Sequence, residues 1–305
     1  MDYRKFVPQA SDKTWKNNYY KTAKELKAAK VPPVLNQAET LMDKKKKPSN
    51  GTDLMMQALE PWEHGSRARQ ISRRVLKAFL EWAVLNGKLP AVYAPPPLSA
   101  IPNILNKKKI GYVLSDLQIL SLIEDEPDEK WKYVYQLLAT FGLRPAELEY
   151  LVVKDDGQGE EVWSMYEKSM GGKKGERTEP RELCPLPLIG ADGKAIDFKL
   201  LERIKLGEDL PYLGRGGEVA MTMNTRFRRW DLWKRYRKEA ERIKQVCVPY
   251  SFRHRYAKVS HSIGFPLPNI AESMGHTPEV HMQNYARFKP SGTKEMYKKA
   301  NELAA

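Results

Sequence analysis

The stretch FGLRPAELEYL, residues 141–151, is the part of the sequence that says most about the fold. Gly142 can end a preceding helix in the left-handed conformation, and Pro145 fits the first position of a new short helix. Arg144 stands between them, just before the new helix, where free N–H groups and the helix dipole favour an anion. Glu147 follows one turn later. The stretch therefore predicts a helix, a tight turn and a second helix, with charged side chains at the junction.

A β-hairpin with a long loop is predicted next, over residues 160–189. The strand-like runs EVWSMYEKSM and RELCPLPL flank a turn rich in glycine and lysine. Lys168 lies at the end of the first strand, whereas Lys173 lies in the turn. Either lysine could supply a proton, and a lysine in such a turn is usually only exposed. We prefer Lys168 because of its place at a strand end.

Two further stretches carry side chains suited to chemistry. PYSFRHRYA, residues 249–257, places Arg253 and its cationic neighbours between aromatic residues, which fits either a solvated basic helix face or the wall of an anion site. In SMGHTPEVHMQNYARF, residues 273–288, His276 is followed nine residues later by Tyr285. Taken alone, this tyrosine reads as a core aromatic. The order of all four stretches along the chain favours a functional role.

In that order, the stretches resemble the tyrosine recombinase (phage integrase) family. Its pattern is a Gly-Leu-Arg turn, a hairpin lysine, an H-x-x-R-H box, a Gly-His box and a tyrosine nine residues after that histidine. The resemblance covers about residues 108–290. Tyr250 stands where the family's box usually begins with histidine. A tyrosine can still donate a hydrogen bond to a phosphate oxygen, but at neutral pH it accepts a proton much less well than imidazole.

The resemblance implies an enzyme that exchanges DNA strands through a 3′-phosphotyrosyl intermediate, with no ATP and no other cofactor. Tyr285 would attack the phosphodiester while two arginines stabilise it, and Lys168 would protonate the leaving 5′ oxygen. His276 would bind the phosphate or help to deprotonate the tyrosine. The implied catalytic residues are Arg144, Lys168, Tyr250, Arg253, His276 and Tyr285. Glu147 and His254 are expected to hold these side chains in place without contacting the phosphate.

The charge of the chain fits a polyanionic partner. Lysine and arginine number 52 against 38 acidic residues, which gives a net charge of +14. Such a balance most often accompanies nucleic acid, although a merely soluble basic protein is the plain alternative. Two basic helices are predicted, over residues 66–86 and 224–245. The candidate contacts to double-stranded DNA are Arg69, Arg73, Lys77, Arg226, Arg228, Arg229 and Arg235.

The helix predicted over residues 66–86 has two expected faces. Ser66 suits its N-cap, and Gly87 follows its last turn. The residues expected to face the core are Ile71, Val75, Ala78 and Trp82. The cations expected on the opposite, solvent-facing side are Arg69, Arg73 and Lys77, at i, i+4 and i+8.

The fold class expected is mainly α with a small β-hairpin. A length of 305 residues favours two domains. We expect an N-terminal helical core-binding bundle over 1–90, a Pro-rich linker over 91–107 and an α+β catalytic domain over 108–305, which together clamp duplex DNA in a C shape. A last helix over 293–303 packs on its own domain or, as the resemblance implies, docks on a neighbour in a tetramer on DNA.

The composition indicates in which cellular compartment the protein is expected. Two distant cysteines fit a reducing cytosol, no apolar run is long enough for a membrane, and the N-terminus lacks a secretory signal. The histidine spacing fits no familiar zinc site, so we expect no metal. These features favour a cytoplasmic, nucleoid-associated protein of a bacterial or phage-infected host. Two alternatives stay open: a type IB topoisomerase-like enzyme, and a DNA-binding protein with a degenerate recombinase site.

Overall fold

In a computed structural model, the chain forms two compact units, Met1–Lys108 and Lys109–Ala305. The structure describes residues 2–7, 10–103, 109–155, 157, 159–168, 177–214, 218–288, 294, 297–298 and 301–302. Lys173 and most of the helix expected over 293–303 lie outside these described residues. Each unit has its own buried core and is considered by itself.

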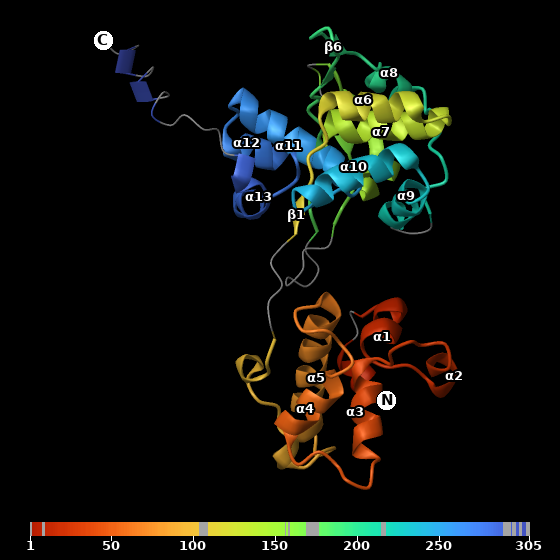
Figure 1. The fold of residues 1–305 in the computed structure, drawn as a ribbon, viewed down its shortest axis with the longest axis vertical. Coiled ribbons are helices and arrows are strands. Elements are labelled where there is room, and N and C mark those ends of the chain that lie inside the picture. Colours follow the sequence, from red (N-terminus) through yellow and green to blue (C-terminus); the bar gives the residue numbers. More distant parts are fainter. Residues whose placement is uncertain are drawn as a thin grey trace. The chain divides into compact units, whose positions relative to one another are not determined.

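The first unit is a helical bundle in which α3, α4 and α5 pack on one another (Figure 1). Its elements are η1 (Asp2–Phe6), α1 (Asp12–Asn18), α2 (Ala23–Leu26), α3 (Val34–Met42), α4 (Gly51–Leu59), α5 (Arg67–Leu85), η2 (Ala91–Tyr93) and η3 (Leu98–Ala100). Leu35, Leu54, Met55 and Leu76 are fully buried between the helices. Such burial of aliphatic side chains is the main source of stability in a small bundle.

Helix α5 begins as the sequence predicts but faces the core differently. The Ser66 hydroxyl caps it by accepting from the Arg69 amide at 3.1 Å. The buried residues are Arg69, Ser72, Val75, Leu76, Leu80 and Ala83, whereas Ala78 is exposed. The helix is therefore rotated from its expected orientation, and part of its basic stripe lies inside the bundle.

The proline-rich segment after α5 packs against the first unit as far as Ile101. The Arg73 guanidinium donates to the carbonyl of Ile101 at 2.9 Å and also to that of Leu98. The Tyr93 hydroxyl donates to the carbonyl of Pro48 at 3.0 Å. The segment expected as a linker is thus held to the bundle by hydrogen bonds at Tyr93, Leu98 and Ile101.

The second unit is mainly helical with three small sheets in its described part. Its helices are α6 (Asp116–Asp125), α7 (Glu129–Phe141), η4 (Pro145–Tyr150), α8 (Leu200–Lys205), α9 (Val219–Phe227), α10 (Asp231–Arg242), α11 (Ser251–Ile263), α12 (Leu267–Ser273), α13 (Pro278–Tyr285) and η5 (Ala286–Phe288). Its strands are β1 (Ile110–Gly111), β2 (Leu151–Asp155), β3 (Glu160–Ser164), β4 (Arg181–Glu182), β5 (Leu188–Ile189), β6 (Ala195–Ile196) and β7 (Gln245–Val246).

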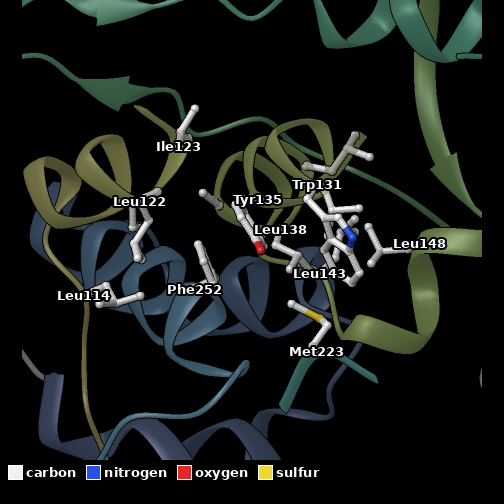
Figure 2. Close-up of a cluster of buried hydrophobic side chains, with 14 of the residues drawn as sticks. Leu114, Leu122, Ile123, Trp131, Tyr135, Leu138, Leu143, Leu148, Met223 and Phe252 are labelled. Carbon is white, nitrogen blue, oxygen red and sulfur yellow. The ribbon is translucent and has the colours of Figure 1, made fainter. Parts of the chain in front are cut away.

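Helix α7 lies at the centre of this unit and is buried along most of its length. It packs on α6 and α11. In Figure 2, Tyr135 of α7 and Phe252 of α11 lie among the leucines of the core. Their rings stack with centroids 5.8 Å apart. This packing holds α11 against α7, whose C-terminal end leads into the Gly-Leu-Arg turn.

The largest sheet is antiparallel, in the order β2-β3-β4. The hairpin predicted over residues 160–189 corresponds to β3 and β4, which pair Ser164 with Arg181. Strand β2 adds a third member, with Val153 opposite Val162. Short pairs complete the unit: β1 runs parallel to β7, and β5 is antiparallel to β6.

The basic helix predicted over 224–245 is broken in two. Helix α9 ends at Phe227 and α10 begins at Asp231, with Trp230 between them as the N-cap. The rings of Phe227 and Trp233 stack with centroids 3.9 Å apart, so core packing holds the bend. A single continuous helix could not bring both aromatic residues into the same stack at this geometry.

Candidate active site

The Gly-Leu-Arg turn forms as the sequence predicts. Gly142 ends α7 with φ 58°, and a Cβ there would collide with the ring of Tyr256, so only glycine fits. Arg144 then caps η4, and its backbone N–H donates to the carboxylate of Glu147 at 2.6 Å. The Arg144 side chain also donates to this carboxylate, at 2.7 Å. A three-residue spacing therefore places the arginine and the glutamate together.

Glu147 is the hub of the site. It is fully buried and receives two hydrogen bonds from Arg181, at 2.7 and 3.2 Å. Arg253 lies 3.7 Å from it. Burial alone would raise the pKa of Glu147, but Arg253 and Arg181 outweigh it and lower that pKa to about 2. Three guanidiniums around one carboxylate leave two positive charges without a described acidic partner.

Arg253 of α11 is fully buried behind this hub. It donates to the carbonyl of Gly142 at 2.5 Å and also to that of Met274. Its Nε has no hydrogen-bond partner among the described residues. Burial lowers the pKa of Arg253 to about 10, and the adjacent Arg144 adds to that effect. At neutral pH the group is still a cation, and its Nε–H is available to donate a further hydrogen bond.

His276 follows a glycine turn that the arginines hold. Gly275 has φ 59°, and its carbonyl accepts from Arg144 at 2.6 Å. The His276 Nε2 lies 3.1 Å from the Arg253 guanidinium, which can only donate, so Nε2 accepts and Nδ1 carries the proton. Burial, with the charge of Arg253, lowers the pKa of His276 to about 2. The ring is therefore neutral.

Tyr285 ends helix α13 and is 3% exposed. Its ring stacks on His276 with centroids 5.9 Å apart and meets His254 edge-on at 5.6 Å. Burial raises the pKa of Tyr285, and a hydrogen bond from Arg253 opposes the rise. The side chain is a phenol whose hydroxyl is directed at the buried guanidinium.

Tyr250 and His254 border this arrangement. Tyr250 lies at the start of α11 and is 39% exposed. It is close enough to Tyr285 for its charge to raise the pKa of that tyrosine. The ring of His254 fits against Gly111, where a Cβ would collide with it. Both residues lie beside the nucleophile candidate, on the same helix turn as Arg253.

Lys168 is exposed at the far end of the hairpin. Its backbone N–H donates to the Thr178 hydroxyl at 2.9 Å, and its carbonyl accepts from the Thr178 amide at 2.9 Å. These bonds hold its backbone, while its ammonium makes no described contact with the arginine cluster. Its alternative, Lys173, lies outside the described residues.

Arg181 is the site residue that sequence reasoning missed. Besides Glu147, it binds the carbonyl of Ser273 at 3.0 Å. A groove of about 960 Å³ lies beside it, lined in part by Trp163, His276 and Thr277. Only the pairing of β4 with β3 brings this arginine to the site, and no local motif marks it.

The candidate DNA contacts divide into two kinds. Arg69 is 5% exposed and donates to the carbonyls of Leu59 and Trp62. The prediction that it faces DNA is therefore wrong, because it is an internal ligand of the bundle. Arg73 binds the carbonyls described above, Lys77 pairs with Glu81, and Arg226 pairs with Glu126. The candidates left exposed are Arg228, Arg229 and Arg235.

Two searches of the described residues bear on ligands and membranes. They contain no group of three or more histidine, cysteine or acidic side chains arranged to hold a metal ion. None of their helices is long and apolar enough to span a bilayer.

Comparison with solved structures gives the class of fold. The chain aligns with the Tn1549 transposon integrase in complex with a circular intermediate DNA, with a TM-score of 0.50 and 14% identity over 99% of this chain and 98% of that one. The same integrase with transposon right end DNA gives 0.51 and 16%, at the same coverage. The chain therefore has the fold of this transposon integrase, and the expected fold class, mainly α with a small β-hairpin, is confirmed.

Two curated proteins of Nostoc sp. are similar in sequence. Excisase C is 30% identical over 172 residues, which cover 54% of this chain and 31% of that protein. Excisase A is 29% identical over 172 residues, or 54% of this chain and 33% of that protein. The chain spans about a third of the length of these relatives. No family model matches the chain.

Proposed function

We propose that this chain is a site-specific DNA recombinase that cleaves through a 3′-phosphotyrosyl intermediate. One observation carries the proposal: two buried guanidiniums and a third, 12% exposed, share a single buried carboxylate beside a buried tyrosine. An excess of two positive charges in a low-dielectric site is costly unless an anion joins it. A phosphodiester supplies that anion and, in the same place, the electrophile for Tyr285.

The arginines act as the phosphate clamp. Arg144 and Arg253 bind non-bridging oxygens and stabilise the charge of the five-coordinate transition state. The Arg253 Nε and the His276 Nδ1–H have no described partners in the free protein, and phosphate oxygens would provide them. Glu147 keeps the guanidiniums from repelling one another. His276 therefore serves as a hydrogen-bond donor to the phosphate.

The covalent step exchanges one ester for another. The Tyr285 oxygen forms a bond to phosphorus, the bond from phosphorus to the 5′ oxygen breaks, and the phenol proton passes to water. Lys168 gives a proton to the departing oxygen and regains one from water, so the protons of the step balance. The energy of the broken ester is kept in the phosphotyrosine. Attack by the 5′-hydroxyl of a partner strand reverses the step without ATP.

Entry of DNA requires a local movement. Tyr285 is 3% exposed and Arg253 is fully buried, so a phosphodiester cannot reach either group in the conformation described. The segment that must shift is α13, because it carries the tyrosine and follows the turn that holds His276. Small shifts of one helix against its neighbours are sufficient for such opening.

On a larger scale, the proposal keeps five expectations from the sequence. The two units would clamp duplex DNA in a C shape, and four copies would assemble on two recombination sites. The helix expected over 293–303 would join neighbouring copies. A DNA-acting enzyme of this kind would work in the cytoplasm, at the nucleoid. The exposed Arg228, Arg229 and Arg235 are proposed to contact DNA phosphates.

The decisive experiment is covalent capture on nicked suicide substrates made from source DNA. After SDS quenching, we expect DNA-linked protein with a blocked 3′ end and a free 5′ end. Tyr285→Phe should abolish it, whereas Tyr212→Phe, which changes a tyrosine that is 73% exposed, should not. DNA binding without any adduct would favour the degenerate-site alternative. Adducts accompanied by relaxation of single supercoiled plasmids, but never by strand exchange, would favour the topoisomerase-like one.

A further inference from the structure

Two buried histidines form a direct link between the helix of Arg253 and the helix of Tyr285. His261 lies on α11 and His281 on α13, and their Nε2 atoms are 3.0 Å apart. They are 6% and 0% exposed. Neither residue is among the candidate catalytic residues that the sequence motifs indicated.

The link reaches the candidate nucleophile directly. His281 precedes Tyr285 by one helical turn, and their ring centroids are 4.9 Å apart. On its other side, His281 is 5.8 Å from the ring of His276. His261 contacts Phe288, whose ring also packs on Tyr285. The pair is therefore part of the wall against which the tyrosine ring rests.

The chemistry of the pair demands a defined arrangement of protons. A hydrogen bond between two Nε2 atoms needs one donor and one acceptor, so one ring carries its proton on Nε2 and the other on Nδ1. Burial, together with His261 and Arg253, lowers the pKa of His281 to about 4, and burial also lowers that of His261. Both rings are thus neutral near neutral pH, and one of them donates to the other.

The hydrogen bond adds direction to the packing between the two helices. Two apolar rings of similar size would fill the same space, but they would not fix the distance between α11 and α13. The bond ties Arg253 and Tyr285, which must cooperate on one phosphate, through their own helices. It does so without touching the phosphate itself.

We propose that His281, held by His261, is a positioning residue that orients the Tyr285 ring toward Arg253. This inference rests on the proposed function, because it assigns the pair a role in the same cleavage step. The hydrogen bond between His261 and His281 fixes the position of the Tyr285 ring when α13 closes on bound DNA. Loss of the bond should lower the cleavage rate while leaving affinity for DNA unchanged.

Two substitutions separate the hydrogen bond from the ring. His281→Phe keeps the ring and removes the bond, whereas His281→Gln places an amide nitrogen near the position of Nε2 and can keep the bond. We expect adduct formation on the suicide substrate to slow about tenfold in the first variant, the kinetic equivalent of one hydrogen bond. It should return to within about threefold of the starting rate in the second. His64→Gln, at an exposed position of the first unit, is the matched control.

Two results would overturn the proposal: a Phe variant as fast as the parent, or Phe and Gln variants slowed equally with unchanged DNA affinity. If His281→Phe does not fold, the reciprocal pair His261→Phe and His261→Gln repeats the comparison from the other helix.

A second readout keeps this test separate from the test of the function. Hydrogen exchange of the backbone amides over residues 278–288 reports on α13 in the free protein. We expect faster exchange there in His281→Phe and recovery in His281→Gln. If the parent protein forms no adduct on any DNA, the proposed function fails, while exchange still decides whether the pair holds α13. Equal exchange in all variants would refute the positioning role.

Discussion

Both units of this protein bury arginines, and the comparison shows which of them indicate function. In the first unit, the Arg69 side chain meets only backbone carbonyls at the end of α4, and no carboxylate is among its described partners. In the second unit, Arg144, Arg181 and Arg253 converge on one carboxylate. Arg69 by itself satisfies carbonyl groups at the end of a helix. The converging set creates a positive site that lacks an anion.

The comparison also explains why burial alone is a poor guide to function. A buried guanidinium satisfied by carbonyls is a structural ligand, because its long stem packs and its head replaces water at orphan carbonyls. The Nε atoms of Arg69 and Arg253 both lack a hydrogen-bond partner among the described residues, so what distinguishes the second cluster is its surplus of positive charge over one carboxylate. A surplus of positive charge next to a phenol is what a phosphoryl-transfer site needs.

The same conservative change at Arg253 and Arg69 should therefore give opposite results. Arg253→Lys removes the fork that would hold a phosphate, and we expect adduct formation to fall at least about 100-fold. Arg69→Lys leaves the carbonyls of α4 poorly satisfied, so it should lower the melting temperature while the adduct forms within about twofold of the parent rate. Suicide-substrate kinetics and thermal unfolding measure both. A comparable loss of cleavage in the two variants would break the distinction between the regions.

The carboxylate at the centre of the second cluster gives the next largest effect, on stability. The pKa of Glu147 falls from an ordinary 4.5 to about 2. A lowered acid pKa means that this stabilisation is complete above pH 4.5 and is lost as pH falls toward 2. Glu147→Gln should cost the second unit roughly 3 kcal/mol of unfolding free energy at pH 7. Its stability should then change less than the parent's between pH 4.5 and 2.

Denaturant unfolding across this pH range checks the prediction, with Glu272→Gln, an exposed carboxylate on α12, as the control. The buried histidines affect stability in a different pH range. The pKa of His281 is lowered to about 4, beside His261, His276, Tyr285 and Arg253, so its contribution is lost between pH 6.5 and 4 in both proteins. A Gln variant that tracks the parent below pH 4.5 would contradict the role of Glu147 as the hub.

Much of the second unit could be predicted because its signals are local. A glycine forced to positive φ, a capping threonine before a proline and a glutamate three residues after an arginine act within one turn. These signals place Arg144, Glu147, His276 and Tyr285 correctly relative to their helix ends. Their order along the chain then implied the fold.

What could not be predicted depends on contacts between distant segments. Arg181 reaches Glu147 across 34 residues and Ser273 across 92. The histidine link spans 20 residues and two helices. The buried face of α5 was predicted wrongly because two sides of the helix could each face the core. An arginine can lie in a core when its aliphatic chain packs there and its guanidinium binds backbone carbonyls. Only tertiary packing decides such cases.

Arg181 offers the finest test of the comparison, since it belongs to the converging set but no motif marks it. It gives Glu147 two hydrogen bonds and Ser273 one, and a lysine, which presents a compact point charge, cannot reproduce that fork. We expect Arg181→Lys to slow adduct formation about tenfold, with DNA affinity unchanged, because it acts through Glu147. Arg177→Lys, on the same hairpin but with a 62% exposed side chain, is the control.

The pairing of rate and affinity decides what Arg181 does. A slower adduct with unchanged affinity means that it orients the phosphate clamp through Glu147. An equal loss of rate and affinity means that it touches DNA itself, from the groove beside His276. If neither changes while the melting temperature falls, Arg181 is a structural ligand like Arg69. The second unit would then contain both structural and functional arginines. Convergence on a shared carboxylate would no longer be sufficient to identify a functional site.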